Sequence, residues 1–411
     1  MSEAILTTTP VDTDKPKFFN YKGITTILGG VGFLGLVAFL SAGSGDTHKF
    51  MLNSYMYGYV FWLMVTCGCL ALTLLHNSIK SSWTLPVLRI FEAGASWQTW
   101  AMLGVGLLPL LLKTDVVYEW ARPEAANDFI LAKKAVFLNK PVFGGVILGG
   151  YALFAFMANT LRKSTNRHDK SLDENEYQFR TNFATPMMVI FVSVLTFVLT
   201  LLAMSLTPKW YSTIYTLWLL IGGCQAALSM AIFLVARNAG KQPYANVMAP
   251  GLTKDLGNMM FVLTMLWGYT SVSQLIILWN GNLPETTVFY AHRGADAMLG
   301  WNLIGASTIL GCFVIPFVTL LSPRVKRYAD RLAMIALFIF CFRILDVYWI
   351  IGASIPNRMS PQAFGPSTIF DATGWVVMAL AWFAVMLNNV DKAPLLPLYD
   401  KRLEEAKKNA H

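Results

Sequence analysis

The sequence predicts an all-α polytopic membrane protein. Its 411 residues are 55% hydrophobic and only 13% charged, which is about half the charged fraction of an average soluble domain. Ten apolar segments are each long enough to cross a bilayer as a helix. Almost all Lys and Arg residues cluster in short segments between these apolar runs. They do not form one basic face with interleaved aromatic residues, which argues against a nucleic-acid-binding protein.

Each predicted span contains about 20 mostly apolar residues, as a helix that crosses the hydrocarbon core requires. The third and tenth spans are the weakest, because they are short and rich in Gly or Trp. Most of the spans are separated by short loops. The ten predicted spans cover residues 23–43, 54–76, 95–113, 141–161, 187–207, 212–236, 257–280, 297–321, 331–352 and 371–389.

The basic residues predict the orientation. If the N-terminus is inside, the inner segments contain 22 Lys and Arg residues and the outer loops contain 9. By the positive-inside rule both termini are then cytoplasmic. The polar N-terminal segment has no small-residue cleavage site after its first apolar run, so we expect no signal peptide and expect the first span to remain as a helix.

The second and sixth spans resemble each other. "YVFWLMVTCGCLALT" (59–73) aligns without gaps on "YTLWLLIGGCQAALS" (215–229), with Tyr, Trp, Leu, Ala and Leu in common. Spans four apart run in the same direction, so this match predicts two four-helix bundles related by a parallel repeat. The predicted units are an N-terminal tail, a peripheral helix with an outer loop, two bundles, and a last peripheral helix with a cytoplasmic tail: 1–22, 23–53, 54–207, 208–352 and 353–411.

The sequence lacks the motifs of cofactor-binding and catalytic proteins. A haem with two histidine ligands needs facing histidines in the membrane, but only His76 of the five histidines touches a span, and it lies at the end of that span. All five cysteines lie in apolar runs, where structural thiols are expected. No phosphate-binding, dinucleotide-binding or catalytic-triad motif is present. We therefore expect this chain to bind no redox cofactor or metal itself.

Two charged residues lie deep in the ninth span. A charge at the bilayer centre costs at least ~2.5–3.5 kcal/mol, and Arg343 lies about 12 residues after Arg331, or ~18 Å deep. Asp346 follows Arg343 at a helical spacing that permits an ion pair. One interpretation is an internal ion pair that fixes the packing of the helices. The other is a station in a proton path, in which Arg343 biases the protonation of Asp346.

Other polar residues extend the predicted path towards both faces. His76, Glu92 and Asp255 lie near the cytoplasmic face, Gln274 lies in the outer half, and Asp115 lies at the outer rim. The alternative is that helix-end charges simply lie among the lipid headgroups, where Glu92 and Asp255 also suit the helix dipole. A path through so few side chains needs intervening water. The predicted proton-transfer residues are His76, Glu92, Asp255, Arg343, Asp346, Gln274 and Asp115.

Five stretches together resemble one protein family. They are "HNSIKSSWTLPVLRIFEA" (76–93), "KAVFLNKPVF" (134–143), "DLGNMMFVLTMLWGYTSVSQLIILWNGNLPE" (255–285), "SPRVKR" (322–327) and "RILDVYW" (343–349). The chain resembles the ActF subunits of bacterial alternative complex III, a quinol:cytochrome c oxidoreductase, within the NrfD/PsrC-like integral membrane family. The resemblance covers nearly the whole chain beyond the N-terminal tail, and the stretch 255–285 is its most specific part.

The resemblance implies a ten-helix subunit with two four-helix bundles in a bacterial inner membrane. It implies several partners: an ActC-like paralogue, an iron–sulfur subunit, multi-haem and mono-haem cytochrome c subunits, small helical membrane subunits and, as a further candidate, a terminal oxidase. Haem c and the iron–sulfur clusters belong to those partners, and menaquinol is a candidate quinol of the complex. In the family the working quinol site is assigned to the paralogue, so this subunit is expected to be a non-redox scaffold and proton conduit.

Two alternatives to proton transfer remain open. In the first, the polar residues are structural and the chain is a passive docking platform for the complex. In the second, the chain is a stand-alone secondary transporter, which a parallel repeat and midplane polar groups would fit. The spans contain few matched Gly or Pro interruptions, which argues against a transporter. The sequence leaves open whether a quinone or a lipid occupies the bundles.

Overall fold

The structure is a computed structural model that describes residues 16–79, 81–295, 299–355 and 367–403. Within these ranges the regular structure is entirely helical, and ten helical segments are long and apolar enough to cross a membrane. The prediction of an all-α, ten-span membrane protein is therefore confirmed. The ten segments are Lys17–Ala42, Asp46–Ile79, Leu88–Leu112, Lys140–Ser171, Glu174–Leu206, Tyr215–Ala236, Pro250–Gly281, Gly300–Leu321, Ala329–Gly352 and Thr368–Val390.

Several helices extend beyond their predicted spans. The largest extensions are in α8 (Lys140–Ser171) and α9 (Glu174–Leu202), which continue through most of the segment expected to be an inner loop. The two helices are joined at Leu172, whose φ of 54° ends α8, and at Asp173, whose side chain accepts a hydrogen bond from the Asn175 amide. Hydropathy marks where a helix leaves the hydrocarbon, whereas local caps such as these set where the helix itself ends.

The first four-helix bundle is built around α2 (Asp46–Ile79). The third span is divided into α3 (Leu88–Gly94), α4 (Trp97–Gly106) and α5 (Leu108–Leu112). α2 packs on α3 and α9, α4 packs on α8, and α8 packs on α9, so the four spans form a closed ring. The break in the third span follows Gly94, where a Cβ would lie 2.8 Å from the Cys69 sulfur.

The second bundle repeats this arrangement around α10 (Tyr215–Ala236). Its other spans are α11 (Pro250–Gly281), the segment formed by α13 (Leu299–Ile309), η7 (Leu310–Val314) and α14 (Ile315–Leu321), and α16 (Ala329–Val347) continued by η8 (Tyr348–Gly352). α10 packs on α11 and α16, α11 packs on α14, and α13 packs on α16.

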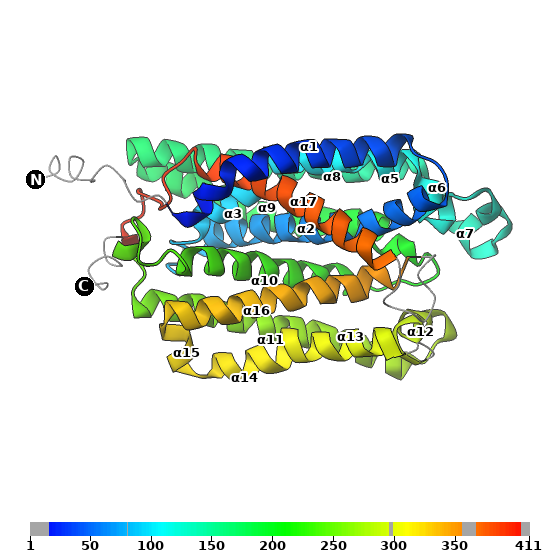
Figure 1. Cartoon of the computed structure of the whole chain (residues 1–411). Coiled ribbons are helices and arrows are strands. Elements are labelled where there is room, and N and C mark those ends of the chain that lie inside the picture. The colour runs from blue at the N-terminus through cyan, green and yellow to red at the C-terminus, as the bar shows by residue number, and fades with distance from the viewer. Residues whose placement is uncertain (1–15, 80, 296–298, 356–366, 404–411) are drawn as a thin grey trace, which may run out of the picture.

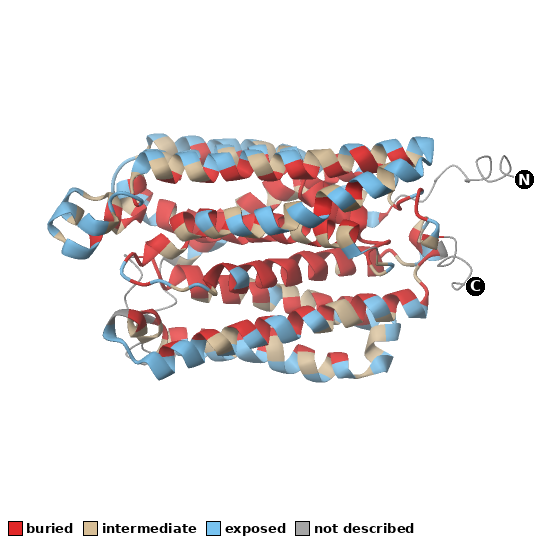
Figure 2. Ribbon diagram, turned by 180° about the vertical axis from the view of Figure 1, so that it is seen from behind, coloured by how far each residue is buried: buried red, intermediate tan, exposed pale blue. Residues whose placement is uncertain are grey.

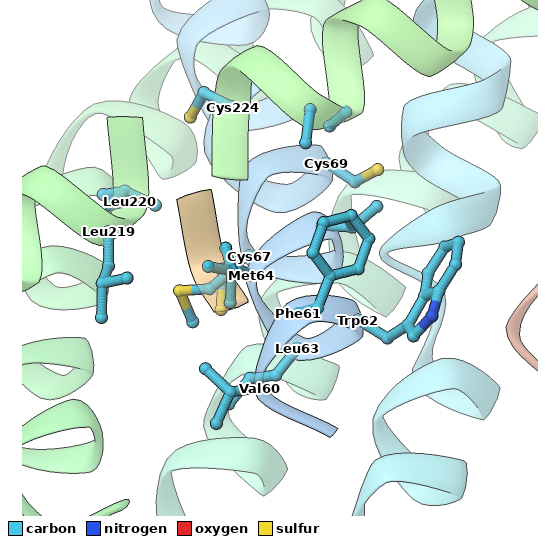
Figure 3. Packing of buried hydrophobic residues seen from close by; sticks show 14 of the residues in the cluster. Val60, Phe61, Trp62, Leu63, Met64, Cys67, Cys69, Leu219, Leu220 and Cys224 are labelled. Carbon is cyan, nitrogen blue, oxygen red and sulfur yellow. The ribbon is translucent and has the colours of Figure 1, made fainter. Parts of the chain in front are cut away.

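The bundles meet where α2 packs along α10 (Figure 3). Gly68 and Gly223 allow this close approach, because a Cβ on either residue would overlap the backbone of the other helix. α2 and α10 are buried over almost their whole length, whereas the outer helices carry most of the exposed residues (Figure 2). Close contact through small residues is typical of helix packing in membranes.

α1 (Lys22–Ala42) and α17 (Ser367–Val390) are additions to the first bundle. α1 packs on α17, and α17 packs on α2 and α3. Trp382 of α17 donates a hydrogen bond to the Thr66 hydroxyl at 2.9 Å, and Trp62 donates to the Trp375 carbonyl at 3.2 Å. α1 begins and α17 ends at the same end of the molecule, here named the terminal end (Figure 1). The opposite end, which carries α12 (Pro284–Tyr290), is named the α12 end.

Candidate functional site

The charged pair predicted in the ninth span lies on α16 and is almost fully buried. The guanidinium of Arg343 contacts the carboxylate of Asp346, and each side chain is about 1% exposed. The Arg343 guanidinium carbon lies 5.0 Å from the centre of the Trp267 ring on α11. It also lies directly against Gly222 of α10, where any side chain would overlap it. Three helices of the second bundle therefore enclose the pair.

The pair does not satisfy all of its own polar atoms. Among the described residues, Nε and Nη1 of Arg343 and Oδ1 of Asp346 have no hydrogen-bond partner. Buried polar atoms in folded proteins are nearly always hydrogen-bonded. The pair consequently keeps the capacity to donate and accept further hydrogen bonds, which a purely structural ion pair would not need.

A cavity of about 760 Å³ lies beside the pair in the second bundle. It is lined by residues of α11, α12 and α13, and Asp346 and Trp349 form part of its wall. The lining is mainly apolar and aromatic, with a few polar side chains. Its aromatic members are Trp218, Trp267, Trp279, Tyr290, Phe313 and Trp349.

Three π-helical segments adjoin the cavity: η6 (Ala291–Ala295), η7 and η8. A π-helical turn shifts backbone carbonyls away from their α-helical partners, and such turns often mark functional sites. Arg293 in η6 uses carbonyls of η8, donating to those of Trp349 at 3.1 Å and Ile350 at 2.6 Å. This arginine is 2% exposed, and burial lowers its pKa to about 9.

Arg293 was not predicted as a site residue. In the sequence it is one basic residue of an expected outer loop, and nothing in its neighbourhood marks it as buried. The structure folds that loop back over the bundle through α12 and η6, so that Arg293 lines the cavity. Only the tertiary contacts between η6 and η8 could have revealed it.

A second buried polar cluster lies at the terminal end of the first bundle. Arg89 donates to Glu92 at 2.7 Å and also pairs with Asp169 of α8. His76 at the end of α2 is hydrogen-bonded to Thr84. His76 also interacts electrostatically with Arg89, so the predicted residues His76 and Glu92 share one cluster. Both are buried rather than placed at an exposed helix end.

The C-terminal segment 395–403 covers this cluster. The Tyr399 ring stacks on His168 with centroids 4.5 Å apart, and the Arg180 guanidinium lies 4.4 Å from the centre of the same ring. The Leu398 amide donates to Asp169 at 3.1 Å. Burial raises the pKa of Asp400, but the hydrogen bond and charge of Arg402 outweigh this effect and hold that pKa below its usual value.

The other predicted residues do not join either cluster. Asp255 on α11 and Asp115 in α6 (Thr114–Val117) are exposed, and they belong to different bundles. Gln274 is buried, but it accepts a hydrogen bond from Ser212 at 2.5 Å and is not part of the cavity wall. The seven predicted residues therefore do not form one continuous line through the molecule.

No group of three or more His, Cys, Asp or Glu side chains in the described part of the chain is arranged to hold a metal ion. Comparison of the chain with models of protein families gives no match, and comparison with curated protein sequences gives none either.

Proposed function

We propose that this chain is a membrane subunit of a quinol-oxidising respiratory assembly and that it transfers protons through its second bundle. The observation that carries the proposal is the buried Arg343–Asp346 pair, whose aspartate forms part of the wall of a cavity. Charged residues in membrane spans are costly and typically mark proton or ion pathways. The redox chemistry of the assembly is assigned to partner subunits, as the resemblance to the ActF family implies.

The second bundle also contains buried polar groups between the Arg343–Asp346 pair and the terminal end. Gln225 lies one turn along α10 from Gly222, which Arg343 contacts, and it donates to Thr264 of α11 at 3.0 Å. Ser229 follows one turn later and is also buried. Asp346 places the pair on the cavity wall, and this seam between α10 and α11 supplies a direction from the pair towards the terminal end.

This route replaces the predicted entry through His76 and Glu92. Those residues lie in the first bundle, and a proton leaving them for Arg343 would have to cross the contact between α2 and α10. That contact is tightly packed with apolar side chains such as Leu63, Met64 and Leu219 (Figure 3). A route that stays within the second bundle avoids this barrier.

The rival function is a passive docking platform. The direct contact between Arg343 and Asp346 favours a platform, because an ion pair that only stabilises helix packing would also be in direct contact. The double variant Arg343→Met/Asp346→Leu distinguishes the two, because apolar replacement of a buried pair is often neutral for stability. Proton transfer predicts an assembled complex that oxidises quinol but translocates fewer protons per electron. A platform predicts that both activities are unchanged.

The respiratory assignment has its own test. Extraction of the full-length chain from its native membrane in mild detergent should yield a complex that contains haem and iron–sulfur subunits. Haem absorbance and iron content of the purified complex measure this directly. A chain that purifies alone, and that still carries a solute across vesicle membranes, would instead establish a transporter.

A further inference from the structure

The cavity of the second bundle has the properties of a lipid site. It opens between α11 and α13, since the residues that line it include strongly exposed ones on both helices, such as Val272 and Trp279 on α11 and Ile309 on α13. These are apolar side chains within or at the end of predicted membrane spans. An opening bordered in this way gives access from the hydrocarbon rather than from water.

Four polar side chains of the cavity wall gather at one end of the cavity, whereas Ser271, Thr308 and Asp346 line it further in. Asn282, Thr287, Arg293 and Asn302 line it at the α12 end, where α11 leaves its span and α13 begins. These positions correspond to the headgroup depth of a bilayer. The polar wall residues at this end include the buried Arg293. Its guanidinium donates to the neutral carbonyls of Phe289, Trp349 and Ile350 and to the Ser354 hydroxyl, and no carboxylate of the described residues forms an ion pair with it.

The apolar part reaches deep into the bundle. Gly268 lies about 13 residues before Gly281, or ~20 Å along α11, and it lines the cavity together with Phe313. One leaflet of the hydrocarbon core is ~15 Å thick, half of the ~30 Å total. The cavity is therefore long enough for one acyl chain, and its volume of about 760 Å³ lies within the range of ligand sites.

We infer that this cavity binds one anionic phospholipid, with an acyl chain between α11 and α13 and the phosphate at the Arg293 end. The position of Arg293 sets the orientation of the lipid. Among the described lining residues Arg293 carries the only formal positive charge, and it lies at headgroup depth. Asp346 then forms part of the wall beside the chain. The inference does not depend on proton transfer, since lipid binding would occur in a docking platform as well.

The test uses the full-length chain reconstituted in vesicles of equal parts phosphatidylglycerol and phosphatidylcholine, then extracted in detergent for native mass spectrometry. The wild-type chain should retain one phosphatidylglycerol. Ala306→Phe, at an exposed position of the wall, should reduce its occupancy about tenfold, equivalent to 1.4 kcal/mol, and Ser271→Phe should act in the same way. Val318→Phe is the matched control, because Val318 is exposed on α14 outside the cavity and should retain the lipid.

A second variant tests the headgroup. Arg293→Gln keeps a donor for the η8 carbonyls but removes the charge, and should abolish the preference for phosphatidylglycerol over phosphatidylcholine. Equal lipid retention by wild type and both filling variants would overturn the inference. So would a wild-type chain without bound lipid, or one that retains added menaquinone in the cavity and no phospholipid.

Discussion

The guanidinium of Arg343 and the carboxylate of Asp346 are in direct contact one turn apart on α16, and neither side chain is more than about 1% exposed. Removing two charges from water carries a penalty that their mutual attraction only partly offsets. The ring of Trp267 lies against the Arg343 guanidinium, and Gly222 leaves room for it because glycine has no side chain. The pair is thus held in one position by three helices, at a cost that an apolar pair would avoid.

The first prediction concerns the stability of this pair. Arg343→Met should lower the free energy of unfolding by ~3–5 kcal/mol, because Asp346 would remain as a buried charge without its partner. Thermal unfolding of the purified chain in detergent measures the change. Arg331→Met on the exposed start of the same helix is the control and should change stability by less than ~0.5 kcal/mol. Equal effects of the two substitutions would show that the buried pair contributes nothing specific.

The second prediction concerns the contact between the bundles. Gly223→Ala should destabilise the chain by ~1–3 kcal/mol or more, because its Cβ would overlap the Met64 backbone and force α2 and α10 apart. Gly35→Ala on α1 is the control, since a Cβ there meets no atom within 4 Å, and removing a helical glycine should stabilise by ~0.5–1 kcal/mol. Melting temperatures of the two variants should move in opposite directions.

The third prediction concerns Tyr399. Its ring packs against His168 and Arg180, which are hydrogen-bonded to each other at 2.9 Å, but its hydroxyl has no hydrogen-bond partner among the described residues. Tyr399→Phe should therefore be within ~0.5 kcal/mol of the wild type, whereas Tyr399→Ala should cost ~3–5 kcal/mol, as truncation of a buried aromatic residue does. Limited proteolysis at the C-terminal end checks this result. Rapid cleavage of both variants would mean that the hydroxyl holds the segment.

The fourth prediction concerns pH. The folded chain holds the pKa of Asp400 below its unfolded value of ~3.9, mainly because Arg402 offsets the effect of burial. A carboxylate with a depressed pKa stabilises the fold above the unfolded pKa, and this stabilisation is lost as the pH falls through the folded value. The difference in melting temperature between the wild type and Asp400→Asn should be full at pH 6–7 and shrink below about pH 4. A difference independent of pH would contradict this.

Much of the fold follows from periodicity and composition. The apolar segments are predictable because a bilayer requires helices of a minimum length, and the match between 59–73 and 215–229 identified the two helices that form the centre of the molecule. The continuation of α8 to Ser171 was missed, because charged residues that leave the hydrocarbon can still be helical. The break after Gly94 was missed because it depends on contacts with Cys69 and Trp382.

The candidate site was only partly predictable. Arg343 and Asp346 stand out because they are charges in an apolar run at helical spacing. Arg293 and Tyr399 do not stand out in the sequence. They are buried only because the tertiary structure brings distant segments of the chain together. The predicted bundle bounds already placed His76, Glu92 and Asp115 in the first bundle and the other candidates in the second. One path through both bundles was expected because the sequence does not reveal that the contact between α2 and α10 is packed with apolar side chains.

Proton translocation by the complex that contains Asp346→Asn tests the central claim most directly. The reconstituted complex is supplied with quinol and an electron acceptor, and the protons released per electron are measured with a pH-sensitive dye. Proton transfer through Asp346 predicts that Asp346→Asn oxidises quinol but releases fewer protons per electron, and that Asp346→Glu restores much of the loss. An assembled Asp346→Asn complex with the wild-type proton-to-electron ratio would contradict the proposal.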